Sequence, residues 1–196
     1  AAGHASAGEL DVWDATLADA AAPLIAARAE AVEELAAPFA ATARELGLEG
    51  AASVAYAPRA TGTAAELREG LEQRREADLK LGRSSWGPHL DELKIALDDR
   101  ALRRYGSQGQ QRAALLALLF AERDALLEAR RVAPLMLLDD VMSELDPDRR
   151  ERLVELLQKG GQALITAADE ESVPAGAMDS VVRMEDLLAP PHAAAA

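Results

Sequence analysis

The sequence predicts an α/β protein that carries a helical arm. Apolar residues recur at spacings of three and four over residues 9–46, which is the period of an amphipathic helix. After a loop rich in Gly, Ser and Pro at residues 82–89, strand-like and helix-like patterns alternate, as they do in an α/β sheet. We therefore expect a helical arm subdomain at 1–82, an α/β lobe at 83–188 and a disordered, low-complexity tail at 189–196.

The arm is expected to contain two helices. In the first, Pro23 and Pro38 should kink or divide the helix. Residues 47–52 form a break, and residues 53–57 read as a possible short strand. From Thr63, the pattern T-A-A-E is a capping box that opens a second helix reaching about Leu81, so the pair is able to form an antiparallel arm. The second helix carries three arginines, for which a solvated face is favoured over a role in nucleic-acid binding: Arg68, Arg74 and Arg75.

The lobe begins with residues 92–97, where apolar and polar residues alternate as in a half-buried strand. Asp98 and Asp99 supply a turn. A helix should begin near Gly109, with an apolar stripe that we expect to be core, and another should begin at Pro147 with Asp146 as its N-cap. The remaining expected strands lie at 100–105, 134–139, 162–166 and 180–184, and the expected stripe is Leu115, Leu116, Leu119 and Leu126.

Composition excludes several function classes. The chain has no cysteine, which excludes disulfides, thiolate metal sites and a cysteine nucleophile, and is consistent with the cytoplasm. A net charge of −13 argues against broad, nonspecific adhesion to nucleic acid, so any DNA contact needs a local basic face or a partner. No signal peptide or membrane-spanning run is visible in the sequence.

Two adjacent aspartates end the apolar run at 135–138. Ligands of open α/β sheets gather beyond the carboxyl ends of the strands, and a carboxylate there suits Mg²⁺. In this Walker B arrangement Asp139 would orient the metal and Asp140 would polarise the attacking water as a general base. The alternative is that the pair only caps the following turn.

The helix entrance at 107–112, S-Q-G-Q-Q-R, is the second candidate site. Ser107 stands where an N-cap belongs, and Gly109 allows another molecule to approach the backbone. The free N–H groups of a helix start, with the helix dipole, form an anion site suited to a terminal phosphate. An ordinary serine cap before a core helix remains the alternative.

Taken in order, these motifs resemble a known family. Residues 107–112 are similar to the signature motif of ABC-type ATPases in its RecF form, 135–140 to the Walker B strand and 143–146 to the D-loop; G-P-H-L-D-E-L at 87–93 and D-V-W-D-A-T-L at 11–17 also look like RecF. The resemblance covers roughly residues 9–185 and implies a partial ABC-type ATPase sheet with a coiled arm. One departure is Leu90, where the family usually has arginine after the histidine.

The resemblance implies an ATP-dependent DNA-binding protein of recombinational and replication-gap repair in the SOS response, acting in the cytoplasm. Its cofactors would be ATP and Mg²⁺, and two copies would dimerise around the nucleotides. The implied partners are DNA at single-strand/duplex junctions, RecO and RecR. The carried-over roles are contact with ATP bound to the other subunit by Ser107, Gln108, Gly109 and Gln110, metal binding by Asp139, hydrolysis by Asp140 and coupling of the two sites by Asp146.

One expected motif is missing from this sequence. No G-x-x-x-x-G-K-[ST] occurs, and no glycine is followed by lysine, so nothing here cradles the α- and β-phosphates. We expect the chain to be the C-terminal portion of a longer RecF-like protein, inactive alone, with exposed apolar edges on its sheet. The alternatives are a non-catalytic regulatory or adaptor module that retains the motifs, and another ABC-superfamily ATPase.

Overall fold

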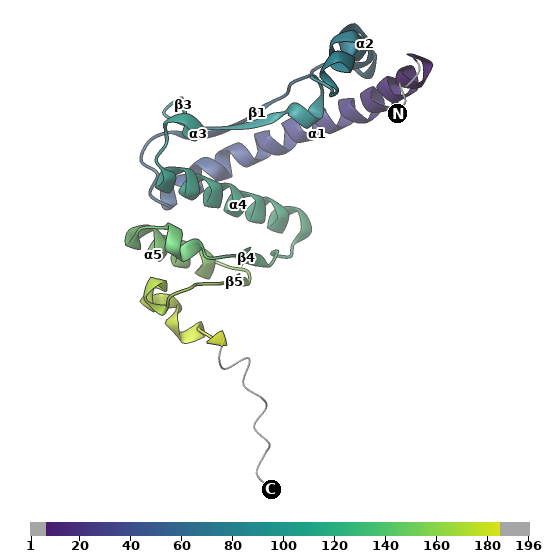
Figure 1. The fold of residues 1–196 in the computed structure, drawn as a ribbon. Coiled ribbons are helices and arrows are strands. Elements are labelled where there is room, and N and C mark those ends of the chain that lie inside the picture. Colours follow the sequence, from purple (N-terminus) through teal and green to yellow (C-terminus); the bar gives the residue numbers. More distant parts are fainter. Residues whose placement is uncertain (1–6, 185–196) are drawn as a thin grey trace.

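The computed structural model describes residues 7–184, arranged as a long helical arm above an α/β lobe (Figure 1). The expected tail at 189–196 lies outside the described residues. Helix α1 (Ala7–Glu45) runs through both Pro23 and Pro38, so neither proline divides it. The C-terminal half of α1 packs against the rest of the chain, and Phe39 and Ala43 are fully buried there.

Helix α2 (Ala64–Leu81) packs against the N-terminal half of α1 and completes the arm (Figure 1). Thr63 is its N-cap, and the predicted capping box with Glu66 is present. Leu67 and Leu71 lie against Ala18 and Ala21 in a small apolar cluster. Further along α2, Arg75 binds Asp14, which precedes those alanines in α1. Residue numbers therefore increase along α2 while those of the facing residues of α1 decrease, so the two helices are antiparallel as expected.

The first sheet joins segments from both sides of the loop at 82–89. Strand β1 (Ala52–Ala57) pairs antiparallel with β2 (Glu92–Leu97) over its whole length, and β2 pairs with the short β3 (Arg100–Ala101). A 3₁₀ turn, η1 (Pro88–Leu90), precedes β2. Asp98 and Asp99 both have positive φ, which confirms the predicted turn between β2 and β3. The boundary that we predicted at residue 82 remains a prediction, and this sheet crosses it.

The remaining elements form the α/β lobe. Helix α4 (Gln108–Arg130) leads into β4 (Met136–Leu138), a 3₁₀ turn η2 (Val141–Glu144), α5 (Pro147–Gln158) and β5 (Ala163–Ile165). Strands β4 and β5 are parallel, with Leu137 opposite Leu164. Two 3₁₀ turns follow, η3 (Glu170–Ser172) and η4 (Ala175–Ser180).

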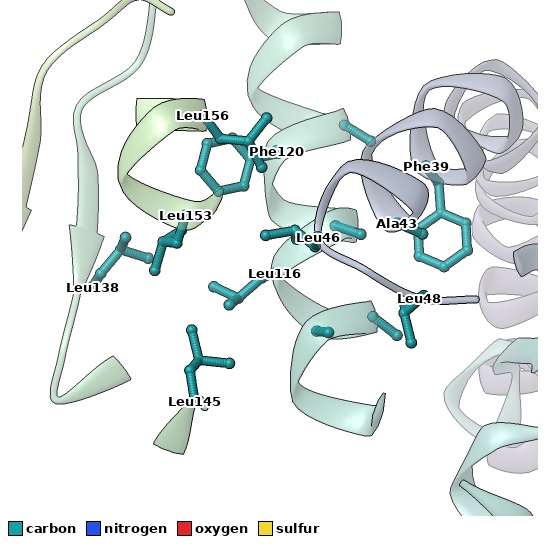
Figure 2. Packing of buried hydrophobic residues seen from close by; sticks show 14 of the residues in the cluster. Phe39, Ala43, Leu46, Leu48, Leu116, Phe120, Leu138, Leu145, Leu153 and Leu156 are labelled. Carbon is teal, nitrogen blue, oxygen red and sulfur yellow. The ribbon is translucent and has the colours of Figure 1, made fainter. Parts of the chain in front are cut away.

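One core holds these parts together. Phe39 of α1, Leu46 just after it, Phe120 of α4 and Leu153 of α5 are all fully buried in one cluster (Figure 2). Burial of large aliphatic and aromatic side chains contributes about 1.5–3 kcal/mol each, so this cluster fixes α4 between α1 and α5. The other face of the β4–β5 sheet is open, because Leu137 and Leu164 are 68% and 62% exposed.

Three expectations are wrong in detail. Only Arg100–Ala101 of the expected 100–105 strand pairs, because Leu102 turns into the core and begins the short helix α3 (Leu102–Tyr105). The expected strand at 180–184 does not form: residue 180 closes η4, and 181–183 have no regular structure. Of the expected leucine stripe only Leu116 is buried, whereas Leu115 and Leu119 are exposed.

Candidate functional site

Ser107 caps α4 in the predicted manner. Its backbone is extended at φ −63° and ψ 160°, and its hydroxyl accepts a hydrogen bond from the Gln110 amide at 3.2 Å. In return the Gln110 side chain accepts from the Ser107 amide at 2.8 Å, which completes a capping box. The predicted helix start is thus confirmed, one residue before Gly109.

The capped end of α4 faces solvent. Ser107 and Gln108 are exposed, Gly109 and Gln110 are half-buried, and the first turn contains no acidic residue. The first amides of a helix have no intrahelical acceptor and carry the positive end of the helix dipole. This end of α4 therefore presents a hydroxyl and amide donors to an incoming anion.

Asp139 and Asp140 follow β4 directly, and both are exposed. Thr166, just after the neighbouring β5, holds them in place: its hydroxyl accepts from the Asp140 amide at 3.0 Å and donates to the Asp139 carboxylate at 2.5 Å. The Thr166 amide donates to the Leu138 carbonyl at 3.0 Å, which continues the parallel pairing. From the sequence, Thr166 ends the expected strand at 162–166, near where a phosphate-sensing residue would lie, and a hydroxyl satisfied at the strand end is an equally good interpretation.

Asp140 adopts a left-handed backbone conformation, with φ 48° and ψ 26°. Aspartate tolerates this region better than most residues, and sparsely populated conformations of this kind cluster at functional sites. The Ser143 hydroxyl lies 2.9 Å from both the carbonyl and the carboxylate of Asp140. Ser143 therefore fixes the carboxylate for which we predicted general-base chemistry.

Asp146 is the N-cap of α5, as predicted. Its carboxylate accepts from the Arg149 amide at 3.0 Å and from the Arg149 guanidinium at 2.5 Å. The backbone hydrogen bond, and then the guanidinium charge, hold the pKa of Asp146 below its usual value. Asp146 is therefore an anchored anion at neutral pH.

Two arginines connect the 107–112 segment with the 143–146 segment. Arg112 of α4 binds both the carboxylate of Glu144, at 3.0 Å, and its carbonyl, at 3.2 Å. The guanidinium of Arg149 lies against Gly109, where a Cβ would stand 3.1 Å from its Nη1. The structure thus brings Ser107 to Gln110 together with Asp146. Asp139 and Asp140 form a separate group with Thr166, and sequence analysis missed both linking arginines.

The carboxylates of Asp139 and Asp140 suit a magnesium ion that takes most of its ligands from water and from a bound phosphate. No group of three or more acidic or histidine side chains gathers into a metal site within residues 7–184. Mg²⁺ commonly takes one or two protein carboxylates and completes its shell with water and phosphate oxygens. Asp139 and Asp140 fit that pattern. Within the same residues, no helix is both long and apolar enough to cross a membrane.

No family model matches the chain, but several curated relatives are RecF proteins. The chain is 37% identical to the DNA replication and repair protein RecF of Moorella thermoacetica over 174 residues, covering 89% of the chain and 47% of that protein. It is 38% identical to RecF of Myxococcus xanthus over 191 residues, covering 90% and 50%. With RecF of Anaeromyxobacter sp. (strain Fw109-5) it shares 44% identity over 176 residues, covering 84% and 48%.

A solved structure, "Structure of the recombination mediator protein RecF-ATP in RecFOR pathway", superposes with a TM-score of 0.71 and 27% identity. The match covers 87% of this chain and 48% of that one. The chain thus spans about half the length of the curated relatives that it matches. It belongs to the RecF family, in which it fits a C-terminal portion of the protein.

Proposed function

We propose that this chain supplies the signature and Walker B half of an ATP site in a RecF-like, ATP-dependent DNA-binding protein of recombinational repair. The observation that carries the proposal is the exposed, acid-free start of α4, beside which Asp146 holds the Arg149 guanidinium. A terminal phosphate held on another polypeptide lobe would lie against Ser107 and the amides of Gln108 and Gly109. The similarity to the RecF-ATP structure supports ATP as the ligand.

The aspartates would serve the second half of the chemistry. Asp139 would hold Mg²⁺ through its carboxylate and water shell, and the metal would supply charge stabilisation for phosphoryl transfer. Asp140, positioned by Ser143 and Thr166, would orient the attacking water and accept its proton. By the resemblance to RecF, Ser107 and Asp139 would serve different nucleotides across a homodimer. Asp146 would couple the two.

Complementation tests this proposal. The chain alone is expected to hydrolyse no ATP, because it carries no phosphate-binding loop. Mixed with a separately expressed lobe of a RecF relative that carries the loop, it should give DNA-dependent ATP turnover. Ser107→Arg should lower that turnover about 100-fold or more, since it removes a phosphate donor and blocks the approach.

The matched control for Ser107→Arg is Thr63→Arg, which replaces the equivalent N-cap of α2 in the arm. It should leave restored turnover within about twofold. Turnover that stays at background after mixing, or turnover that survives Ser107→Arg, contradicts the assignment of the half-site.

DNA binding is supported by three arginines beside the 107–112 segment. Arg100, Arg103 and Arg104 are exposed, and none forms an ion pair within residues 7–184. Arg100 and Arg104 lie 4.9 and 5.3 Å from the ring centre of Tyr105, itself exposed. Unpaired guanidiniums around an exposed aromatic ring suit phosphates and unstacked bases. In a chain of net charge −13 they form a local basic face.

This face can be tested by fluorescence anisotropy on a labelled single-strand/duplex junction at low salt. The double variant Arg100→Gln/Arg104→Gln should weaken DNA binding. It should also reduce the slope of the logarithm of the binding constant against the logarithm of salt concentration by about 1.8, the value for the loss of two phosphate contacts. Arg68→Gln with Arg130→Gln removes the same charge elsewhere and should change the slope little. Equal slopes in both pairs would rule the face out. From the similarity to RecF proteins we further propose a cytoplasmic location and RecO and RecR as partners.

A further inference from the structure

The signature and D-loop segments, 107–112 and 143–146, share one side chain that neither motif contains. Arg149 lies in the first turn of α5, yet its guanidinium reaches out of that helix in two directions. One direction is the Asp146 carboxylate, 2.5 Å from Nη1. The other is the backbone of α4, where Gly109 leaves room for the guanidinium. A Cβ on Gly109 would stand 3.1 Å from the same Nη1, closer than most side chains tolerate.

The Nε of Arg149 adds an independent observation. This nitrogen is buried and has no hydrogen-bond acceptor within residues 7–184, although the side chain as a whole is 21% exposed. A buried N–H without an acceptor is disfavoured, since its interaction with water is lost and not replaced. The guanidinium is thus held between the two motifs at a cost in free energy, whereas an extended side chain would be hydrated by solvent.

The other arginines of α5 have different partners, which singles out this position. Arg150 donates from Nε to the Leu145 carbonyl at 2.9 Å, and Arg152 donates to the Glu45 carbonyl at 3.4 Å, at the end of α1. Within residues 7–184, neither side chain has a hydrogen bond to residues 107–110. Arg112 also links the segments, but its guanidinium binds Glu144 and has no hydrogen bond to residues 107–110 in the same part of the chain.

We infer that Arg149 is a positioning residue, which holds the backbone at Gly109 and the carboxylate of Asp146 as one rigid unit. The inference rests on the proposed function, because it describes how the half-site is presented to a nucleotide on another lobe. The binding of a phosphate at Ser107 would then affect the position of Asp146 through the Arg149 guanidinium alone. The residues between the two segments in the sequence would not need to move.

A double-mutant cycle on the chain itself tests the contact without requiring any ATPase activity. In the wild-type background, Gly109→Ala should lower Tm, because the new methyl group meets a guanidinium that Asp146 holds in place. In an Arg149→Ala background the same change should raise Tm, since alanine favours a helix over glycine. An unchanged sign of the Gly109→Ala effect in the two backgrounds would overturn the contact.

Hydrogen exchange extends the test to both motifs. Arg149→Ala should speed exchange of the amides at 107–111 about tenfold, although these lie some forty residues away along the chain. The control Arg152→Ala, one turn along α5, should leave them unchanged. If Arg149→Ala speeds exchange only in α5, the residue is merely part of the helix cap and the inference fails.

Turnover provides the functional readout in the reconstituted pair of polypeptides. Arg149→Lys keeps the charge but loses the planar fork, so it should lower kcat about tenfold with KM within about twofold of wild type. A raised KM at unchanged kcat, or full activity, would overturn the positioning role. Absence of turnover in the wild-type mixture would instead count against the proposed function, and the thermal and exchange tests would still decide on Arg149.

Discussion

The chain contains two helix starts of nearly identical local geometry, one in the arm and one at the candidate site. Thr63 before α2 has φ −70° and ψ 164°, and Ser107 before α4 has φ −63° and ψ 160°. Each hydroxyl accepts a hydrogen bond from the amide three residues on, at 3.3 Å in α2 and 3.2 Å in α4. In return, a side-chain oxygen of that residue accepts from the N-cap amide, at 2.7 and 2.8 Å. The capping box therefore marks a helix and does not by itself mark a phosphate site.

The two starts differ in charge. The third residue is Glu66 in α2 and Gln110 in α4, so a carboxylate lies against the amides of the arm helix and a neutral amide against those of α4. A carboxylate there already satisfies the positive end of the helix dipole and would repel a phosphate. The neutral Gln110 leaves this field available, and next to Gly109 lies the guanidinium of Arg149, paired with Asp146.

Substitutions that exchange the residue types at positions 66 and 110 should therefore remove the difference in charge between the two helix starts. Gln110→Glu places a carboxylate at the start of α4, keeps the capping box and should not destabilise the fold. It should lower reconstituted ATP turnover about 10- to 100-fold, which corresponds to about 1.4–2.7 kcal/mol of lost phosphate stabilisation. The control Glu66→Gln makes the reverse change in the arm and should leave turnover unaltered. Equal activity of Gln110→Glu and wild type would mean that phosphate does not approach this helix end.

Local signals of this kind explain which expectations hold. T-A-A-E and S-Q-G-Q specify their caps within four residues, and Asp146-Pro147 does the same for α5. The turn at Asp98 and Asp99 likewise depends on two adjacent residues. These features were predictable because the interacting groups are close in the sequence.

Features that depend on distant partners were not predictable in the same way. Helical spacing shows that 115–126 is a helix, but only the position of α1 and α5 decides that Leu116 is covered and Leu115 is not. Similarly, the apolar run at 180–184 satisfies a strand pattern but pairs with no neighbouring strand. Nor does any spacing rule relate Gly109 to Arg149, since their contact exists only after α5 packs beside α4.

Removal of either cap should cost about the same. Thr63→Ala and Ser107→Ala each lose one hydroxyl acceptor, and each should lower the free energy of unfolding by about 1 kcal/mol. Thr63→Ala also loses the hydrogen bond that the Thr63 hydroxyl donates to the exposed Glu66 carboxylate at 2.9 Å. Chemical denaturation followed by circular dichroism would measure both. A much larger loss for Ser107→Ala would show that its hydroxyl carries further structural contacts, and the comparison between the starts would then no longer isolate charge.

The smallest expected effect concerns pH, and it follows from the same difference between Glu66 and Gln110. Hydrogen bonds from the backbone amide and then the hydroxyl of Thr63 lower the pKa of Glu66 below its usual value. A carboxylate whose folded pKa is depressed contributes stability that is present above its unfolded pKa of about 4.3 and is lost as the pH falls through the folded value. The box of α4 has no such group, so its contribution should not change across this range.

The measurement is exchange of the amides at 63–67 and at 107–111 between about pH 6 and 3, corrected for the intrinsic rates. Protection of the α2 start should weaken as the pH falls below about 4, whereas that of the α4 start should follow only global stability. In Glu66→Gln the two starts should respond alike, because the one titrating group that distinguishes them is gone. Loss of protection at the α4 start in parallel with α2 in the wild type would mean that acid loosens the arm and the lobe together, and that the charge of Glu66 does not set the two caps apart.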